Sequence, residues 1–339
     1  MTSPEADVEQ LVTIATGYMA AKQLVAAQKS GLFQALAAGP RTAAQLAEEL
    51  GLQERVVRIL ADSMNAVGLL ERNDGSYSNG RAANTHLSGG AALDLGEFLT
   101  FLDAVSYPQW LQFETTVASG RPGVLDLDGI EPELIGAGIG AFQKLHAAML
   151  AREFDFTPFR TMLDLGGQSP WFAIEAMSAN PDLRTTFVYT EDETPSIRAA
   201  VDAAGLGRRS RFEPADTVTA TPAGWYDVVL LNHCVHRFTA DQNTAILARA
   251  RAAAAPEATL VIVDFFLDAD PRQRILDAMH AAEYLVIDGT IAYPLGDVEA
   301  WLSGTGWRPT HTAVLPGGPR AIVASATSPR CAPDLRFVT

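Results

Sequence analysis

The residues best suited to chemistry directly follow a short apolar segment, Asp227–Leu231. They form the run Asn232-His233-Cys234-Val235-His236, which continues through Arg237, Phe238 and Thr239. An imidazole can take a proton from a hydroxyl group near neutral pH, so His236 is a candidate general base. Two alternatives stay open. A histidine after a strand often only lines a polar crevice, and His233, Cys234 and His236 suggest a metal site, although the sequence shows no matching ligands that would close one.

A second candidate is the turn Asp164-Leu165-Gly166-Gly167, which follows another apolar segment. Paired glycines after a strand let the backbone approach a ligand closely, as in nucleotide and nucleoside sites. The same pair is also found in ordinary tight turns, so the turn alone is a weak signal.

The elements that position these residues alternate between strand and helix from Met162 onward. Such alternation predicts a mostly parallel sheet covered on both faces, with the ligand crevice at the carboxyl ends of the strands. The predicted strands are Thr161–Leu165, Thr186–Tyr189, Ser210–Phe212, Asp227–Leu231, Thr259–Phe266, Thr310–Val314 and Ala321–Ser325. The predicted helices are Phe172–Ala179, Thr194–Ala204, Asp241–Ala254, Arg272–Val286 and Val298–Thr305.

The N-terminal part has a different pattern. Two amphipathic helices are expected between Val8 and Leu36, followed by helices at Thr42–Gly51 and Glu54–Gly68 and a hairpin around Asn73-Asp74-Gly75. Helix, turn, helix and hairpin are typical of a winged helix. We therefore expect a winged-helix dimerisation domain over residues 1–105, and bridging helices (about Leu93–Phe154) with a catalytic domain over 106–339.

Composition restricts the partners. The chain of 339 residues has a formal net charge of −15, which opposes binding to nucleic acid or anionic lipid. The predicted recognition helix offers only Arg55 and Arg58, so a scaffold for dimerisation is favoured over a DNA reader. Two cysteines, an acidic N-terminus and short apolar runs predict a cytoplasmic protein without disulfides or membrane spans.

The order of these modules resembles the bacterial and plant small-molecule O-methyltransferases that use S-adenosylmethionine. The resemblance extends over nearly the whole length and is carried by several stretches. These are Gly31-Leu32-Phe33, Thr42–Leu70, Tyr107–Trp110, Gly120-Arg121-Pro122, Asp155–Phe159, the predicted strands of the catalytic domain and Leu302–Trp307. It implies a Rossmann-like α/β methyltransferase domain after the winged helix, a homodimer, and S-adenosylmethionine as cofactor.

The resemblance also implies roles for individual residues. His236 matches the general base, and Asp264, which ends the strand beginning at Thr259, matches the acid that orients this base, although it equally suits capping of the following loop. No metal is implied. The expected cofactor residues are Asp164, Gly166, Gly167, Glu191 and Asp216, and the expected substrate residues are Tyr107, Trp110, Phe142, His146 and Met279. Further aromatic or Met candidates for an apolar substrate cavity are Met149 and Tyr284.

The chain departs from the family pattern at three places. Gln168, Pro170 and Trp171 replace further glycines after the Gly166-Gly167 pair. Tyr189 or Thr190 stands where an acid for the ribose hydroxyls is expected, and Glu191 or Asp192 takes that role if the turn is shifted. Ile291–Pro294 stands where a second catalytic acid is expected.

Three functions follow. The first is methyl transfer to a hydroxyl of a small aromatic or polyketide-like metabolite, with His236 as base. The second is a methyltransferase-fold enzyme that has lost methyl transfer and catalyses hydroxylation, decarboxylation or cyclisation of a natural-product intermediate. The third is a winged-helix regulator or a ligand-binding protein, which the acidic charge disfavours.

Overall fold

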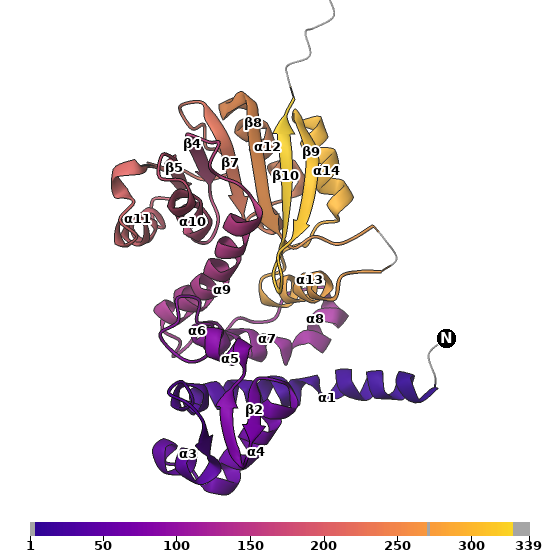
Figure 1. Cartoon of the computed structure of the whole chain (residues 1–339). Coiled ribbons are helices and arrows are strands. Elements are labelled where there is room, and N and C mark those ends of the chain that lie inside the picture. The colour runs from indigo at the N-terminus through magenta and orange to yellow at the C-terminus, as the bar shows by residue number, and fades with distance from the viewer. Residues whose placement is uncertain (1–3, 270–271, 328–339) are drawn as a thin grey trace, which may run out of the picture. The chain divides into compact units, whose positions relative to one another are not determined.

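A computed structural model describes residues 4–269 and 272–327, and Cys331 therefore lies outside the described part of the chain. The fold divides into two compact units (Figure 1). The first comprises Met1–Pro108 and Asp126–Phe142, and the second comprises Gln109–Leu125 and Gln143–Thr339. The expected domain boundary between residues 105 and 106 stays a prediction.

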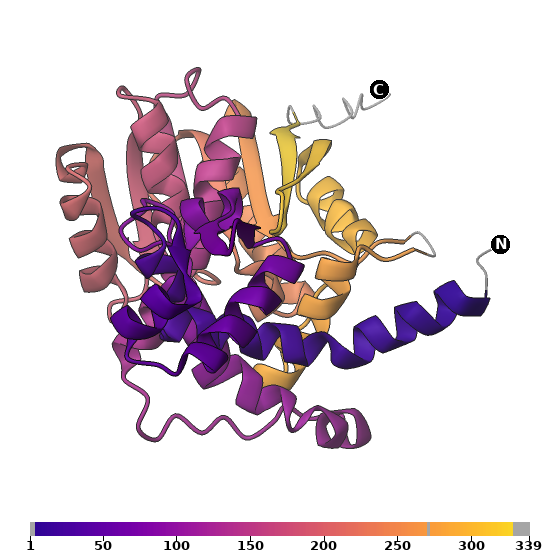
Figure 2. The same cartoon turned by 60° about the horizontal axis from the view of Figure 1, so that its bottom comes forward.

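The first unit contains the predicted helix, turn, helix and hairpin. A long helix, α1 (Pro4–Lys29), is followed by α2 (Leu32–Ala35), α3 (Ala43–Leu50) and α4 (Glu54–Ala66); α1 is the continuous indigo helix in Figure 2. Strands β2 (Leu70–Asn73) and β3 (Ser76–Asn79) form the hairpin, and β1 (Arg41–Thr42) adds a third strand in the order β1-β3-β2. Short helices α5 (Arg81–His86) and α6 (Gly96–Phe101) and a π-helical segment (Leu102–Ser106) complete this stretch.

Local signals explain these elements. Thr42 accepts a hydrogen bond from the Gln45 backbone amide, and the Gln45 side chain accepts one from the Thr42 amide, which gives α3 a full capping box. The hairpin turns at Asp74 and Gly75, whose φ angles of 47° and 80° match the type I′ geometry that the Asp-Gly pair predicts. Tyr77 on β3 and Phe33 on α2 are both buried in the core of this unit.

The second unit is built on a seven-stranded sheet with the order β6-β5-β4-β7-β8-β10-β9. The first five strands in this order pair in parallel, and β10 is antiparallel to both of its neighbours. The strands are β4 (Thr161–Leu165), β5 (Arg184–Tyr189), β6 (Ser210–Pro214), β7 (Tyr226–Asn232), β8 (Ala254–Asp264), β9 (Trp307–Val314) and β10 (Arg320–Ala326). The predicted mostly parallel α/β sheet is confirmed.

Helices cover both faces of this sheet (Figure 1). Helices α10 (Trp171–Ala179) and α11 (Thr194–Ala203) pack on one face, where Phe172, Phe187 and Ile197 share a core. Helices α12 (Ala240–Ala253) and α14 (Leu295–Gly304) pack on the other face, where Leu247, Leu302 and the buried Trp307 share a second core. Helix α13 (Ile275–Ile287) follows the β8 strand.

Several predicted boundaries were wrong by a few residues. Strand β8 begins at Ala254 rather than Thr259, because residues 254–258 continue in extended conformation beside β7. Helix α13 begins at Ile275 rather than Arg272. The sequence predicts helices over Leu93–Phe154 with a Gly/Pro loop near Gly120-Arg121-Pro122-Gly123. The structure confirms both: the helices are α6, the π-helical segment, α7 (Tyr107–Trp110), α8 (Phe113–Ser119) and α9 (Pro132–Glu153), and the loop separates α8 from α9. Gly120 ends α8 in a left-handed conformation with φ 66°, which explains the break.

Helix α9 runs from one unit into the other. By length and composition it is apolar enough to cross a membrane, with a mean hydropathy of 1.2 over its best window. Core helices of soluble proteins meet the same test, so this helix is weak evidence for a membrane span. Its second half carries the buried polar side chains Gln143 and His146, which contribute to the interior of the second unit.

Candidate active site at the carboxyl ends of the strands

The structure brings His236 and Asp264 into direct contact. The imidazole Nδ1 lies 3.0 Å from Asp264 Oδ1 and 2.9 Å from Asp264 Oδ2, and both side chains are buried, with 5% and 0% exposed. Asp264 ends β8, and His236 lies in a short 3-10 turn (Val235–Arg237) after β7, its parallel neighbour. An Nδ1–H that donates to the carboxylate leaves Nε2 of His236 as the proton acceptor.

Asp264 has further hydrogen bonds that hold it in place. Its Oδ1 accepts a hydrogen bond from the Phe265 amide at 2.9 Å, and its Oδ2 accepts one from the His236 amide at 3.2 Å. The Asp264 carboxylate therefore has both of the roles considered from the sequence, because it caps the following loop and also pairs with the His236 imidazole. Burial opposes ionisation of Asp264, but the neighbouring His236 and these hydrogen bonds outweigh it and lower the pKa of Asp264.

Tyr284, on α13, supports the pair from a second side. Its ring stacks on the His236 ring with centroids 4.0 Å apart and planes 13° from parallel. Its hydroxyl donates a hydrogen bond to Asp264 Oδ1 at 3.2 Å. The sequence predicted Tyr284 only as one of several aromatic residues that line a cavity. It did not predict this contact, because the sequence does not show which turn of α13 faces β8.

The glycine pair adopts the strained turn that its sequence suggests. Gly166 has φ 82° and Gly167 has φ 145°, a region that side chains rarely adopt. A Cβ on Gly167 would lie 2.7 Å from the Asn232 carbonyl oxygen, and one on Gly166 would lie 2.3 Å from the Thr217 hydroxyl. The turn at the end of β4 therefore packs directly against the ends of β7 and the loop after β6.

Asp164 is held by the chain itself. Its Oδ2 accepts a hydrogen bond from the Tyr189 hydroxyl at 2.9 Å, and its Oδ1 accepts one from Asn232 Nδ2 at 3.3 Å. The Tyr189 hydroxyl also lies 3.0 Å from the Ser169 carbonyl oxygen. Complete burial raises the pKa of Asp164 to about 8, although these hydrogen bonds act in the opposite direction.

Two buried polar atoms near the turn lack a hydrogen-bond partner among the described residues. They are Asn232 Oδ1 and His233 Nε2, both at the carboxyl end of β7. His233 has φ 47°, which is unusual for a residue with a side chain. Unsatisfied buried polar atoms are costly, so such atoms beside a glycine turn fit a polar ligand. Sequence reasoning missed Asn232, although it stands directly before the candidate histidines.

The other two cofactor candidates lie in loops after neighbouring strands. Asp216, which follows β6, accepts hydrogen bonds from the Val218 and Thr219 amides through Oδ1. Its neighbour Thr217 contacts the glycine turn, as described above. Glu191 is exposed after β5, and it is Glu193 that binds the Thr190 hydroxyl and amide in this turn.

The five substrate candidates divide between the two units, so their convergence stays a prediction. In the first unit Phe142 stacks on Phe98, and the Tyr107 ring lies under the Lys22 ammonium group. In the second unit the Trp110 indole donates to Glu283, and Met279 is 58% exposed.

The remaining candidate, His146, is fully buried. A Cβ on Gly318 would lie 2.2 Å from the His146 ring, so the loop before β10 packs tightly against it. Burial lowers the pKa of His146 to about 3 and that of His233 to about 4, so both imidazoles are neutral at pH 7. Burial raises the pKa of the Cys234 thiol, which disfavours the thiolate that a metal needs. Among the described residues, no group of three or more metal-ligating side chains converges.

Comparison with known proteins identifies the class. An O-methyltransferase domain model matches residues 117–308, and an O-methyltransferase dimerisation domain model matches residues 12–89. The chain belongs to the O-methyltransferase family, whose members transfer a methyl group from S-adenosylmethionine.

Individual relatives agree with this. The chain is 30% identical to 3-hydroxy-5-methyl-1-naphthoate 3-O-methyltransferase of Streptomyces sahachiroi, over 89% of this chain and 90% of the relative. It is 26% identical to the tetracenomycin polyketide synthesis 8-O-methyl transferase TcmO of Streptomyces glaucescens, over 91% of this chain and 93% of TcmO. The crystal structure of the S-adenosylmethionine-dependent methyltransferase SibL is similar with a TM-score of 0.81 at 26% identity, and the match covers 94% of this chain and 99% of SibL.

These findings confirm the expected family, fold class, methyltransferase activity and cofactor. The alternative of a fold relative that has lost methyl transfer is not favoured. The residues at the strand ends fit the cofactor, because Asn232 Oδ1 is a buried acceptor that has no hydrogen-bond partner among the described residues.

The glycine turn can be tested by Gly167→Ala. A new Cβ meets backbone at 2.7 Å and also forces a non-glycine residue to φ 145°, so we expect a loss of more than about 2 kcal/mol in unfolding free energy. Urea unfolding measures this loss. Gly205→Ala is the matched control, because Gly205 has φ 74° but no atom within 4 Å of an added Cβ. Equal losses in the two variants would show that contact with Asn232 does not constrain the turn.

Asp164→Asn tests the raised pKa of the buried acid. Since the pKa of Asp164 is about 8 in the folded chain and the ordinary pKa of an aspartate is 3.8, the folded chain keeps this proton between these two pH values, where the unfolded chain has lost it. Wild-type stability should therefore fall relative to Asp164→Asn as pH rises, by about 1.4 kcal/mol per pH unit. Urea unfolding of both proteins at pH 5, 6 and 7, without cofactor, measures the difference. A difference that does not change with pH would show that Asp164 is ionised throughout.

Proposed function

We propose that this enzyme methylates a hydroxyl group of an aromatic or polyketide-like metabolite, with His236 as general base. The observation that carries the proposal is the buried contact between His236 Nδ1 and Asp264 at 2.9 Å, which assigns proton acceptance to Nε2. The names of relatives support the substrate class. One relative methylates a naphthoate, and another acts in the synthesis of the polyketide tetracenomycin.

S-adenosylmethionine supplies an electrophilic methyl group. The chain's own contribution is to remove the proton of the acceptor hydroxyl, because a neutral hydroxyl is a poor nucleophile. In our proposal that proton passes to His236 Nε2. Asp264 stabilises the resulting imidazolium through Nδ1–H, and the stacked Tyr284 ring keeps the imidazole from rotating.

The remaining residues hold the two substrates. For the cofactor we propose Gly166 and Gly167 with Asp164, Asn232, Asp216 and Glu191, of which Asn232 Oδ1 offers an unused acceptor for an ammonium group. Tyr189 or Thr190 occupies the position where an acid for the ribose is expected, and the Tyr189 hydroxyl donates a hydrogen bond to Asp164. For the acceptor we propose Tyr107, Trp110, Phe142, His146 and Met279.

His236→Gln tests the base. Glutamine keeps a hydrogen-bond donor near Asp264 but cannot take the proton, so we expect turnover to fall by about 10²- to 10⁴-fold while folding is retained. Turnover is measured as methylated product from S-adenosylmethionine and hydroxynaphthoate or hydroxylated polyketide acceptors, and binding of S-adenosylmethionine by calorimetry. His311→Gln, at an exposed histidine on β9, is the matched control.

Asp264→Asn completes this test, because an amide cannot hold the imidazole in the same tautomer. The turnover of Asp264→Asn should therefore also be lower than that of the wild type. An unchanged rate in His236→Gln would exclude the proposed base, and a folded wild-type protein that binds no S-adenosylmethionine would contradict methyl transfer itself.

We propose further that two copies of the chain form a homodimer through the first unit. The dimerisation domain match covers residues 12–89, which include most of α1 and all of α4. On α1, Leu11, Ile14 and Tyr18 follow helical spacing and are 68%, 71% and 55% exposed. An exposed apolar stripe of this kind is typical of a protein interface.

The other partner expectations remain proposals. In helix α4, Arg58 pairs with Glu54 at 2.6 Å, which leaves little positive charge for DNA. This pairing and the net charge of −15 support an enzyme that binds neither nucleic acid nor membrane. The presence of only two cysteines supports a cytoplasmic location.

The dimer can be tested by the double variant Leu11→Glu and Ile14→Glu. Two carboxylates on the apolar stripe should prevent association, so light scattering should report about 36.2 kDa for the variant and twice that mass for the wild type. Val314→Glu, at an exposed apolar residue on β9, is the control and should stay dimeric. A variant that remains dimeric would exclude this face of α1 from the interface.

A further inference from the structure

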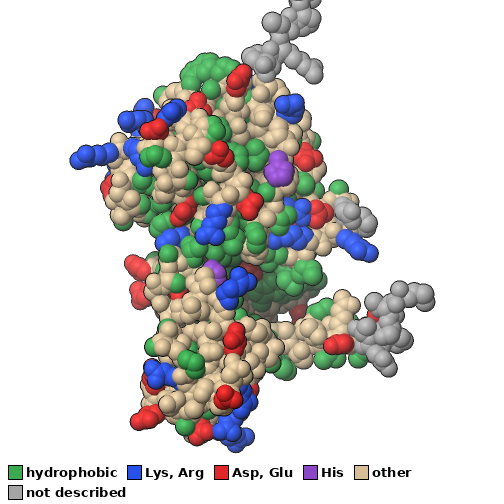
Figure 3. All heavy atoms as spheres, viewed as in Figure 1, with side chains coloured by type: hydrophobic (Ala, Val, Ile, Leu, Met, Phe, Trp, Pro, Cys, Tyr) green, Lys and Arg blue, Asp and Glu red, His purple; other side chains and the backbone are tan. Residues whose placement is uncertain are grey.

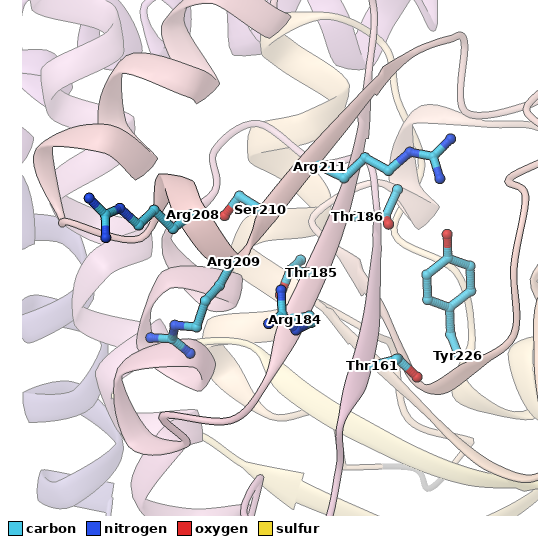
Figure 4. Close-up of a pocket in the computed structure, with 9 residues that line it drawn as sticks. All are labelled: Thr161, Arg184, Thr185, Thr186, Arg208, Arg209, Ser210, Arg211 and Tyr226. Atoms are coloured by element: carbon cyan, nitrogen blue, oxygen red, sulfur yellow. The ribbon is translucent and has the colours of Figure 1, made fainter.

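A cavity lies at the amino ends of strands β4, β5 and β6, at the opposite end of the sheet from His236 (Figure 4). Its volume is about 240 Å³. This is enough for a phosphate-sized group and smaller than the cavities that hold drug-sized ligands. The cavity is lined by Thr161, Arg184, Thr185, Thr186, Arg208, Arg209, Ser210, Arg211 and Tyr226.

The lining is strongly basic. Four of its nine residues are arginines and none is acidic. Several Lys and Arg side chains also gather at this end of the second unit in the space-filling view (Figure 3). This concentration stands out in a chain with a net charge of −15.

The positive charge is largely uncompensated. Arg209 donates to the carbonyl oxygens of Asn180, Leu183 and Met177, which fixes its position but does not neutralise it. Arg211 pairs with Glu213 at 2.9 Å. Within the part of the chain that the structure describes, the side chains of Arg184 and Arg208 have no hydrogen bond or ion pair. Among the described residues, the carboxylate of Glu213 is thus the only one paired with these arginines, and the guanidinium groups of Arg208 and Arg209 point away from that of Arg211 (Figure 4).

Hydroxyl groups lie on the same side of the sheet as two of these arginines. Arg184 and Thr186 alternate with Thr185 and therefore project from one face of β5. Figure 4 shows the Thr186 and Tyr226 hydroxyls turned toward each other near Arg211. The Tyr226 hydroxyl donates to the Ala223 carbonyl oxygen at 3.0 Å, and that fixes its direction.

We propose that this cavity binds a phosphate-type anion, either free or as the phosphate group of a small molecule. Guanidinium groups bind phosphate oxygens in a bidentate manner. The hydroxyls of Thr161, Ser210 and Tyr226 already donate to backbone carbonyl oxygens, so the arginines carry the binding. The site is separate from methyl transfer, since it lies at the amino ends of strands whose carboxyl ends carry the glycine turn. Its role is therefore to bind a second ligand and not to take part in the reaction.

The arginines have one other explanation. Strand β6 is an edge strand of the sheet, and charged side chains on edge strands prevent pairing with other chains. Protection of an edge strand requires charged side chains, but it requires neither a particular anion nor saturable binding of an anion. The two explanations predict different results for the same variants.

The test uses inorganic pyrophosphate as probe and the full chain in low-salt buffer, with binding measured by calorimetry. The wild type should bind with a Kd below about 1 mM, and Arg184→Gln combined with Arg211→Gln should raise that Kd by about tenfold or more. Arg308→Gln, an exposed arginine on β9 at the other edge of the sheet, is the matched control and should bind like the wild type. Citrate as a second probe shows whether the site prefers phosphate to carboxylate; equal or tighter binding of citrate would overturn the phosphate assignment.

The proposal is overturned if the wild type shows no saturable binding of pyrophosphate, or if the double variant binds it as tightly. Aggregation of the double variant without saturable binding in the wild type would instead support edge protection. Methyl transfer is assayed separately and without pyrophosphate, and the double variant should keep wild-type turnover. Failure of the anion site and failure of the proposed methyl transfer are thus distinguishable.

Discussion

The site depends on a carboxylate that is buried at the end of a parallel strand. A charge in that position is costly unless every oxygen has a partner. Asp264 meets this requirement with two backbone amides, one imidazole and one phenol, which come from the turn after β7, the residue after β8 and helix α13. The need to satisfy Asp264 therefore fixes the orientation of His236 and ties Tyr284 of α13 to the end of β8.

A second acid in the same layer has a different environment. Asp164 is also fully buried, but it is bound by the neutral donors Tyr189 and Asn232, and burial raises its pKa to about 8. Asp264, beside a histidine, has a lowered pKa. Two carboxyl groups on nearby parallel strands are thus set to opposite protonation states by their partners, a pattern common where one fold must bind ligands and move protons.

The sequence predicted the sheet well because its signals are local. Apolar runs, the Asp-Gly turn and the helix start at Thr42 each depend on a few neighbouring residues, and all appear in the structure. The pairing of His236 with Asp264 came instead from resemblance to a family. The contacts of Tyr284 and Asn232 were not predicted, because both depend on how distant elements pack. The predicted start of α13 was wrong for a different reason, because the loop before Ile275 has no strong capping signal.

The position of Tyr189 explains how the chain keeps the fold while it departs from the family pattern. An acid at the end of β5 would lie beside the protonated Asp164 and place a negative charge next to it in a buried layer. The Tyr189 hydroxyl there lies 2.9 Å from Asp164 Oδ2 and 3.0 Å from the Ser169 carbonyl oxygen, and so ties β5 to the segment after the glycine turn. Ser169 in turn donates to Gln143 on α9, and Gln143 also contacts Gln168. Tyr189, Ser169, Gln143 and Gln168 thus form one connected network, which joins β5 and α9 to the segment after the glycine turn.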